Sequence, residues 1–272
     1  MVCTGCGLGR TEPQVSPHEI GRYYPNRYYG NAEQLVATQI AGRWAGTSSW
    51  RPEREKVDFV NRFRRSGRIL DVGCAEGKFL WALDRTSWET WGLEFNAELA
   101  SLGGRIKDVH IVAGTLDSAA LPKGAFDAVT FWHVLEHLPD PAQALVRARE
   151  LLRDNGLLII SLPRLDSWQA AWFRTHWYPF TDVPRHYYHY SKHAIELLLA
   201  RAGFDRISHH AFAGSVSFHC WKHSLRSVLR SRFGREWPYY PLKPFLHPLA
   251  WLERLSDSYS TLTTVALKTS AN

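Results

Sequence analysis

Short apolar runs alternate along this chain with segments in which apolar residues recur every three or four positions. The first pattern is typical of buried β-strands and the second of amphipathic helices. We expect strands at residues 68–72, 88–95, 109–114, 126–132 and 157–163, and two closing strands at 206–213 and 261–269. We expect helices at 52–65, 78–83, 97–105, 141–152 and 191–204. This alternation predicts an α/β fold, in which a mostly parallel sheet of seven strands carries helices on both faces.

The regular pattern occupies only part of the chain. Residues 1–50 are rich in Gly, Pro and Tyr and are expected to form an N-terminal extension of loops and a short helix. The α/β domain is expected to span residues 51–272, with an aromatic and basic insertion at about 214–258. Asn155 and Gly156 are expected to close the helix before the fifth strand, because both residues readily end helices.

Strand ends are the informative places in such a fold. Ligands of an open α/β sheet bind beyond the carboxyl ends of its strands, so the residues that follow the strands form the crevice. In this chain those residues are 71–77, Glu94, 114–117 and 132–137. We expect them to converge on one site.

The turn after the first strand lies within RILDVGCAEGKFL at 68–80 and contains Gly73 and Gly77. Glycine permits a positive φ and lets the backbone approach a ligand closely. Glu94 ends the second strand, where a carboxylate can accept hydrogen bonds from both hydroxyls of a ribose, and Phe95 beside it could pack on an adenine ring. The turn reads Gly-Cys-Ala-Glu-Gly rather than G-x-G-x-x-G, which favours a nucleoside ligand without a diphosphate.

These motifs resemble those of the class I S-adenosylmethionine-dependent methyltransferases. ILDVGCAEGKF is similar to their first motif, GLEF to their second, and GTLDSAALPKGAFDAV to the segment that holds adenine and leads into the fourth strand. HVLEHLPDP at 133–141 resembles the small-molecule branch that includes the ubiquinone-pathway O-methyltransferases. The resemblance covers about residues 54–204. It implies an enzyme with a Rossmann-like fold and S-adenosylmethionine as its cofactor.

The resemblance also implies roles for individual residues. Glu94 would hold the ribose hydroxyls. The other residues expected to contact the cofactor are Asp71, Gly73, Cys74, Ala75 and Gly77 around the methionine part and ribose, Phe95, Thr115, Leu116 and Asp117 around the adenine, and His133. Ala75 stands where the family more often has glycine, and alanine preserves the turn if its φ is negative. Considered without the family, Asp71 could cap a helix and Glu94 could be a solvated strand end.

The chemistry of methyl transfer asks little of protein side chains, because a sulfonium is already an activated methyl donor. Alignment of the two reactants can supply roughly 7–11 kcal/mol. A base is needed if the acceptor arrives protonated, and His133, His137 and His186 are the candidates. His137 could equally anchor its loop by hydrogen bonds, and Glu136 carries the same ambiguity. Arg185 and His186 follow the fifth strand and are expected to contact the acceptor.

Charge and missing motifs narrow the choice of acceptor. The chain has 33 Lys and Arg against 26 Asp and Glu, a formal charge of +7, which favours nucleic acid, anionic lipid or phosphorylated metabolites as partners. After the fourth strand, however, the sequence has no Asn/Asp-Pro-Pro-aromatic tetrapeptide, a motif of DNA amino-methyltransferases. It also has no Pro-Cys nucleophile, a motif of cytosine-C5 methyltransferases. These absences argue against a nucleic-acid substrate, and the resemblance to the small-molecule branch implies a small-molecule or lipid-linked acceptor, methylated at oxygen. An RNA methyltransferase and a non-catalytic binding scaffold are the alternatives.

Cys3 and Cys6 form a C-x₂-C pair, which supplies two of the four ligands that a structural zinc site needs. No second pair exists in the sequence, so zinc bound by this chain alone is not expected and no residue is assigned as a metal ligand. His18 could be a third ligand. The pair resembles the latter half of a zinc ribbon found ahead of some methyltransferases of this branch. Because Cys3 follows Met1 closely, we expect that the first half was lost or lies outside this reading frame.

Two further patterns bear on location. No run approaches the roughly 18 apolar residues of a membrane span, and the N-terminus lacks the apolar core of a signal peptide, so a cytoplasmic protein is expected. The stretch WPYYPLKPFLHPLAWLERL at 237–255 mixes apolar, aromatic and basic residues. It could lie in a membrane interface, line an apolar acceptor pocket, or form an ordinary cap. Peripheral contact with a membrane is therefore a further expectation.

Overall fold

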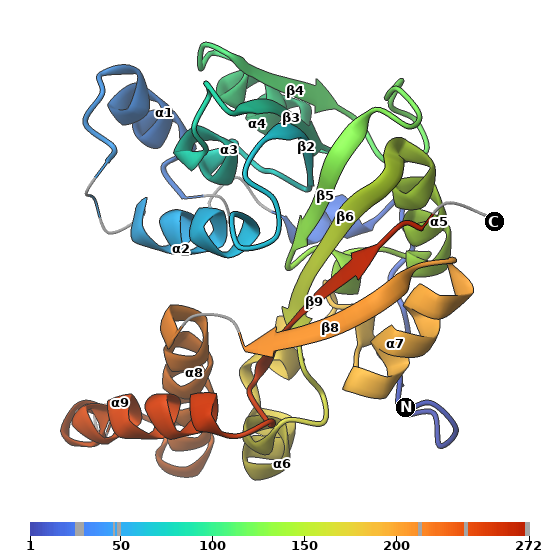
Figure 1. Cartoon of the computed structure of the whole chain (residues 1–272). Helices are drawn as coiled ribbons and strands as arrows, with labels where there is room; N and C mark the ends of the chain where they lie inside the picture. The colour runs from blue at the N-terminus through green and yellow to red at the C-terminus, as the bar shows by residue number, and fades with distance from the viewer. Residues whose placement is uncertain (25–29, 46, 48–49, 212–213, 237–238, 270–272) are drawn as a thin grey trace.

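The computed structural model describes residues 1–24, 30–45, 47, 50–211, 214–236 and 239–269. Its main feature is a seven-stranded sheet in the order β4-β3-β2-β5-β6-β9-β8 (Figure 1). The strands are β2 (Gly67–Val72), β3 (Trp88–Glu94), β4 (Val109–Ala113), β5 (Phe126–Trp132), β6 (Leu152–Pro163), β8 (Asp205–Ala211) and β9 (Thr261–Leu267). The first five strands in this order, from β4 to β6, run parallel to one another. Strand β9 is antiparallel to both β6 and β8. This confirms the predicted mostly parallel sheet.

Helices cover both faces of the sheet, because successive side chains of a strand point to opposite sides. Ile69 and Ala128 pack on one face with helices α2, α3 and α4. Their neighbours Leu70 and Val129 pack on the other face with α5 and α7 (Figure 1). The helices are α1 (Ala32–Ile40), α2 (Trp50–Val60), α3 (Lys78–Ala82), α4 (Ala97–Gly103), α5 (Pro141–Leu151), α6 (Trp168–Phe173), α7 (Lys192–Arg201), α8 (Gly214–Phe233) and α9 (Tyr239–Leu255), with short 3-10 turns η1 (Ile20–Tyr23), η3 (Leu135–His137), η4 (Arg174–His176) and η5 (Tyr178–Asp182).

Two of the predicted boundaries were wrong. Asn155 and Gly156 do not close a helix, because β6 begins at Leu152 directly after α5. Asn155 adopts a positive φ of 57° inside the strand, near the place where the register with β5 shifts. Asparagine tolerates this conformation in a bulge as well as at a helix end, so the dipeptide alone could not distinguish the two. Helix α2 also ends earlier than expected, at Val60, and Arg64 beyond it reaches Asp127 with a distance of 3.2 Å between Nη1 and Oδ1.

The N-terminal extension lies along the loop that follows β6. Its strand β1 (Gly9–Arg10) pairs antiparallel with β7 (Tyr188–His189). Just beyond β1, the Thr11 hydroxyl donates a hydrogen bond of 2.7 Å to the carbonyl oxygen of His186. The aromatic stretch predicted at 21–30 is described up to Tyr24, and residues 25–29 lie outside the described residues. The extension thus becomes one wall of the region beyond the sheet.

The insertion predicted at about 214–258 forms the two helices α8 and α9, which pack with α6 beyond one end of the sheet (Figure 1). Glu253 on α9 is buried among them. Its Oε2 accepts hydrogen bonds from Gln169 Nε2 on α6 (2.7 Å) and from Trp221 Nε1 on α8 (2.9 Å). A buried carboxylate is costly unless it is bonded, so these contacts fix α9 in place. Among the described residues, no helix combines the length and apolar character needed to cross a membrane.

Candidate functional site

The segments that follow β2, β3 and β4 are joined by hydrogen bonds, as the sequence predicts for one crevice. The Gly73 N–H donates to the Leu93 carbonyl (2.7 Å), and the Gly114 N–H donates to the Glu94 carbonyl (2.9 Å). The Ala75 N–H donates to Glu94 Oε2 (2.9 Å). The end of β3 therefore holds the turns on both of its sides.

The glycine turn after β2 is shaped by close packing. Gly73 has a φ of 69°, and a Cβ placed on it would lie 2.6 Å from Cγ2 of Val134. The turn therefore lies directly against the segment that follows β5. Ala75 has a φ of 50°, so the condition that its φ be negative is not met, and the turn forms with a left-handed alanine. A left-handed alanine costs about 1–2 kcal/mol, and its hydrogen bond to Glu94 helps to offset that cost.

Glu94 is 3% exposed and lies between two loops. Besides Ala75, the backbone N–H of Asn96 donates to its Oε1 (2.9 Å). Burial raises the pKa of Glu94, although these two backbone hydrogen bonds act in the opposite direction. A carboxylate has about four lone-pair positions, so it can still accept ribose hydroxyls. Phe95 is 50% exposed, which leaves its ring open to a ligand.

Asp71 and Cys74 point into the protein rather than into an open space. Asp71 accepts a hydrogen bond of 2.7 Å from the Thr130 hydroxyl on β5. Its carboxyl group thus bonds to the neighbouring strand rather than to the start of a helix. Burial raises the pKa of Asp71 to about 7. Cys74 packs against Gly92, where an added Cβ would lie 2.5 Å from its sulfur. Burial, together with the charges of Asp71 and Glu94, raises the pKa of the Cys74 thiol, so the thiol is neutral.

The predicted adenine segment follows β4. The Thr115 N–H donates to Ser118 Oγ (2.9 Å), which closes a tight turn. Leu116 is buried beneath this turn, whereas Asp117 is exposed. The turn lies on the side of β3 away from the glycine turn.

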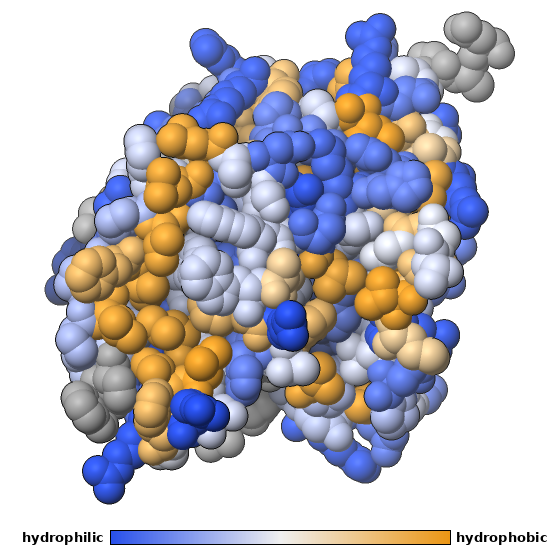
Figure 2. Space-filling model, turned by 90° about the horizontal axis from the view of Figure 1, so that it is seen from below, coloured by the Kyte–Doolittle hydropathy of each residue, from blue (hydrophilic) through white to orange (hydrophobic). Residues whose placement is uncertain are grey.

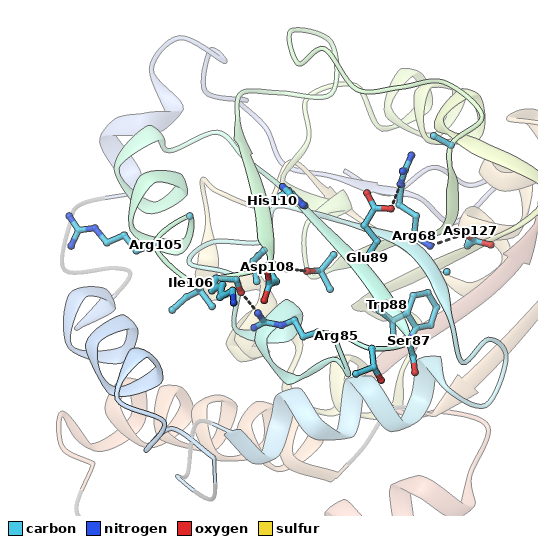
Figure 3. Close-up of a pocket in the computed structure, with 17 residues that line it drawn as sticks. Arg68, Arg85, Ser87, Trp88, Glu89, Arg105, Ile106, Asp108, His110 and Asp127 are labelled. Carbon is cyan, nitrogen blue, oxygen red and sulfur yellow. Dashed lines mark hydrogen bonds and ion pairs between the residues drawn. The ribbon is translucent and has the colours of Figure 1, made fainter.

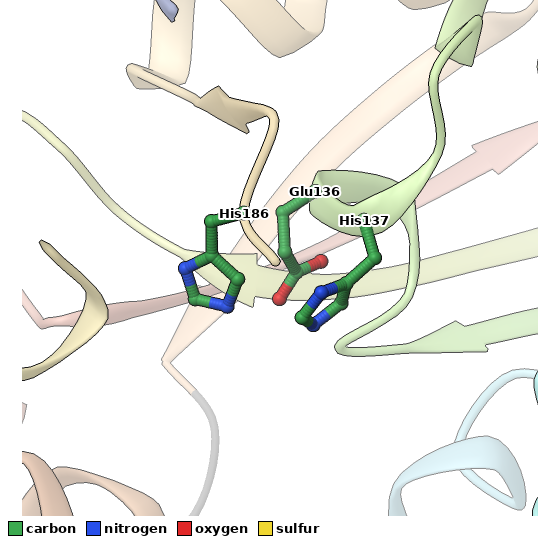
Figure 4. Close-up of side chains that lie close together, drawn as sticks. All are labelled: Glu136, His137 and His186. Carbon is green, nitrogen blue, oxygen red and sulfur yellow. The ribbon is translucent and has the colours of Figure 1, made fainter. Parts of the chain in front are cut away.

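The three candidate bases do not share one environment. His186 is 7% exposed, and its ring centre lies 4.5 Å from that of His137. Glu136, 1% exposed, places its carboxylate between these two rings (Figure 4). Burial and the nearby His137 lower the pKa of His186 to about 3. His133 is more open, with 34% of its side chain exposed, and its Nδ1 lies 3.4 Å from Glu136 Oε1.

Tyr24 is a site residue that sequence reasoning missed. Its hydroxyl lies 3.1 Å from His137 Nδ1, and its ring centre lies 5.7 Å from that of Phe95. The Arg185 guanidinium lies over the same ring, 5.7 Å from its centre. Tyr24 therefore connects residues predicted to bind the cofactor with residues predicted to bind the acceptor. The only signal in the sequence was the aromatic run at 21–30.

A hollow lies at the opposite edge of the sheet. It has a volume of about 980 Å³ and is lined by Gly67, Trp88 and Val109, the first residues of β2, β3 and β4 (Figure 3). Arg68 on its wall is already paired with Glu89, with 2.8 Å between Nε and Oε2. No predicted site residue is among the described residues that line it. Because open α/β sheets bind ligands at the carboxyl ends of their strands, we do not place the cofactor there.

The N-terminal cysteines Cys3 and Cys6 are free thiols. Cys3 is exposed, and the backbone N–H groups of Cys6 and Gly5 lower the pKa of its thiol. Within the described part of the chain, no group of three or more potential ligands includes Cys3, Cys6 or His18.

A family model described as a methyltransferase domain matches residues 48–209, more than half of the chain. The chain therefore belongs to this methyltransferase family. Its sheet order, motifs and relatives make it a class I S-adenosylmethionine-dependent methyltransferase, as the sequence resemblance implied.

Individual relatives refine this assignment. A probable S-adenosylmethionine-dependent methyltransferase of Mycolicibacterium smegmatis is 31% identical over 186 residues, which cover 66% of this chain and 69% of that protein. A ubiquinone biosynthesis O-methyltransferase of Xanthomonas campestris pv. campestris is 34% identical over 100 residues, or 35% of this chain and 42% of the relative, so the chain spans less than half of that relative's length. The solved phosphoethanolamine N-methyltransferase 2 of Haemonchus contortus, in complex with S-adenosyl-L-methionine, has a TM-score of 0.60 at 13% identity, covering 95% of this chain and 61% of that one. At such identity the likeness shows the fold.

Proposed function

We propose that this methyltransferase acts on an oxygen atom of a small-molecule or lipid-linked acceptor. The observation that carries the proposal is the position of Glu136 and its neighbouring histidines on the turn after β5, which packs through Val134 against the glycine turn at Gly73. A hydroxyl must lose its proton when it is methylated, so proton-accepting side chains beside the methyl donor suit an oxygen acceptor. The Xanthomonas relatives, named O-methyltransferases, support the same atom.

The residues at the ends of β2 and β3 fit S-adenosylmethionine. In this proposal Glu94 accepts hydrogen bonds from the ribose hydroxyls, and Phe95 packs against the adenine. The backbone of residues 73–77 follows the methionine part, and residues 115–117 follow the adenine. The bound cofactor supplies a methyl group that is already activated. The contribution of the chain is to align the acceptor with it and to exclude water.

We assign the acceptance of the acceptor proton to His133. Its Nδ1 faces the buried carboxylate of Glu136, and 34% of its side chain is exposed, whereas His186 is buried. A carboxylate that orients one ring nitrogen leaves the other nitrogen for a substrate proton. Arg185 and His186 line the same region and are assigned to contact with the acceptor.

The lipid-linked part of the proposal rests on the outside of α8 and α9. Exposed apolar side chains gather on these helices, and Figure 2 shows apolar residues concentrated on this part of the molecule. We call this area the α8–α9 apolar surface; its residues are Phe233, Tyr240, Leu242, Phe245, Trp251, Leu252 and Leu255. Exposed Lys243, Arg232 and Arg235 border it in sequence. Apolar and basic side chains on one surface favour contact with anionic lipid headgroups.

Calorimetric titration with S-adenosylmethionine tests the cofactor site. We expect saturable binding by the full chain, and a dissociation constant at least tenfold higher, about 1.4 kcal/mol, for Glu94→Ala. Glu89→Ala is the matched control, because Glu89 lies on the same strand β3 at its opposite end. The control should bind as the unchanged protein does. A folded protein that binds NAD and not S-adenosylmethionine would contradict the assignment of this crevice.

Transfer of a labelled methyl group tests the acceptor. The substrates to compare are phenolic and quinol hydroxyls with and without an isoprenoid tail, matched amines, and RNA. We expect O-methyl product from a hydroxyl, with the tailed acceptor giving the lower KM. Product from the amines or from RNA alone, under conditions where S-adenosylmethionine binds, would refute the oxygen assignment and leave the cofactor site intact.

A further inference from the structure

We propose that Glu136, His137 and His186 form a binding site for a divalent transition-metal cation. Each residue offers one ligand atom, and these three atoms all lie within 4.8 Å of one another. Figure 4 shows the Glu136 carboxylate directed to the space between the two imidazole rings. Two of the three side chains are buried, and His137 is half-buried, which leaves an ion a route from solvent.

The hydrogen bonds around the two histidines fix the tautomers that a metal needs. His186 Nδ1 lies 2.9 Å from the carbonyl oxygen of Pro179, and His137 Nδ1 lies 3.1 Å from that of Arg185. A carbonyl oxygen only accepts, so the contact with Pro179 places the hydrogen of His186 on Nδ1 and leaves its Nε2 lone pair available. His137 Nδ1 also lies 3.1 Å from the Tyr24 hydroxyl, which can accept a hydrogen bond from the same N–H as the Arg185 carbonyl. Histidines that bind metals are commonly held by an Nδ1–H bond to a backbone carbonyl in this way.

Glu136 supplies the independent evidence for a ligand. Its carboxylate is almost fully buried, yet neither oxygen has a hydrogen-bond partner among the described residues. The nearest group is His133, whose Nδ1 is 3.4 Å from Oε1, a contact that leaves Oε2 unused. A buried carboxylate in this state is costly, and a cation bound to it would remove the cost. Asp182 approaches His186 Nε2 at 3.4 Å, but its other oxygen is paired with Arg185.

The ligand set indicates the class of ion. Two imidazoles and one carboxylate suit zinc, iron(II), cobalt(II) or manganese(II), whereas calcium and magnesium prefer oxygen ligands throughout. In a tetrahedral site with bonds of about 2.0–2.1 Å the ligand atoms are about 3.3 Å apart, so the side chains must close by roughly an ångström or more. Three protein ligands leave a coordination position open for water or another ligand.

The inference goes beyond the proposed function and does not depend on it, because ion binding can be measured without cofactor or acceptor. The experiment uses the full chain after removal of metals by a chelator, titrated with Co²⁺ and followed by visible absorption and calorimetry. Cys3 and Cys6 could bind the same ion through thiolates, so the titration is done in the Cys3→Ser/Cys6→Ser background. We expect one ion per chain, with no thiolate charge-transfer band.

Substitutions then locate the ion. Glu136→Gln and His186→Gln should each weaken Co²⁺ binding at least tenfold. His193→Gln is the matched control, because His193 is an exposed histidine whose Nδ1 also faces a glutamate three residues away, at 4.0 Å from Glu196 Oε2. It should bind Co²⁺ unchanged. Circular dichroism checks folding, and His137→Gln, at the half-buried position, replaces any variant that does not fold.

Two outcomes would overturn the site. One is no saturable Co²⁺ uptake by the folded Cys3→Ser/Cys6→Ser protein, and the other is uptake that Glu136→Gln and the histidine variants leave unchanged. A parallel titration with S-adenosylmethionine separates this failure from failure of the proposed function. Protein that binds the cofactor but not Co²⁺ refutes the metal site alone.

Discussion

The two halves of the candidate site are built differently. The cofactor half, residues 71–77, 94–96 and 114–117, comes from the ends of three neighbouring strands and is joined largely by backbone hydrogen bonds. The half proposed to hold the acceptor (the acceptor half), residues 9–11, Tyr24, 133–137 and 182–189, comes from segments far apart in the sequence and is joined through the short β1–β7 pair, a backbone hydrogen bond from Tyr187 to Glu136, and side-chain contacts. Sheet topology alone therefore positions the first half. The second half depends on segments added to the sheet.

In both halves of the site, burial shifts the pKa of titratable side chains toward their neutral forms. In the cofactor half it raises the pKa of Asp71 and of Glu94. In the acceptor half it lowers the pKa of His186 to about 3 and that of His189 to about 4. In each case the neutral form is favoured, because a charge loses hydration when it is buried. The cofactor half thus contains buried carboxyl groups and the acceptor half contains buried imidazoles, and burial favours the neutral form of both.

The largest expected effect follows from the packing of the cofactor half. Gly73→Ala places a methyl group at a φ of 69° and 2.6 Å from Val134 Cγ2. The left-handed backbone costs about 1–2 kcal/mol and the overpacking about 1–3 kcal/mol. We expect the free energy of unfolding to fall by about 2–5 kcal/mol, measured by urea denaturation, and S-adenosylmethionine affinity to fall with it.

Gly124→Ala separates the two causes. Gly124 has a φ of 62°, but nothing lies within 4 Å of an added Cβ. The Gly124→Ala protein should lose only the backbone contribution of about 1–2 kcal/mol to its free energy of unfolding. Its affinity for S-adenosylmethionine should be unchanged. Equal destabilisation by the two substitutions would show that the contact between Gly73 and Val134, and so the link between the two halves, is not tight.

The same contrast explains which features could be predicted from the sequence. The strands and the cofactor turn follow from local patterns: Ile69 and Leu70 alternate between the two faces, and Glu94 ends its strand where the ribose is expected. The position of Tyr24 and the approach of His186 to Glu136 depend on contacts between residues more than 45 positions apart, which no local pattern carries. The helix end predicted at Asn155 was wrong, because Asn155 adopts its positive φ inside a strand, and Ala75 likewise adopts a positive φ that its residue type does not require.

The next largest effect is a pH dependence of stability from Asp71. Its pKa is about 7 in the folded protein against 3.8 ordinarily, so between about pH 4 and pH 7 the folded state holds a proton that the unfolded state has released. Stability therefore falls as the pH rises through this window, by roughly 4 kcal/mol. Asp71→Asn should lose this decline while keeping an acceptor for the Thr130 hydroxyl.

Urea denaturation at several values of pH checks this prediction. At pH 8 the Asp71→Asn protein should be more stable than the unchanged protein, and near pH 4 the two should be similar. Thr130→Val is a useful companion, because it removes the hydrogen bond and leaves the carboxyl group in place. Identical pH profiles for Asp71→Asn and the unchanged protein would mean that Asp71 titrates normally and that the cofactor half is more hydrated than its burial indicates.

The smallest effect concerns the outside of the acceptor half. If the α8–α9 apolar surface rests on a membrane, Phe245→Ser/Trp251→Ser should lower binding to vesicles of mixed neutral and anionic lipid by tenfold to a hundredfold, about 1.4–2.7 kcal/mol, because two large exposed side chains no longer enter the interface. Cosedimentation with the vesicles measures the bound fraction of each protein.

Ile40→Ser is the control, since Ile40 is equally exposed on α1, beside the cofactor half. Equal binding by both variants would remove the membrane from the proposal. If high salt removes vesicle binding of the unchanged protein while the apolar substitutions have no effect, the contact is due to charge rather than to the apolar side chains.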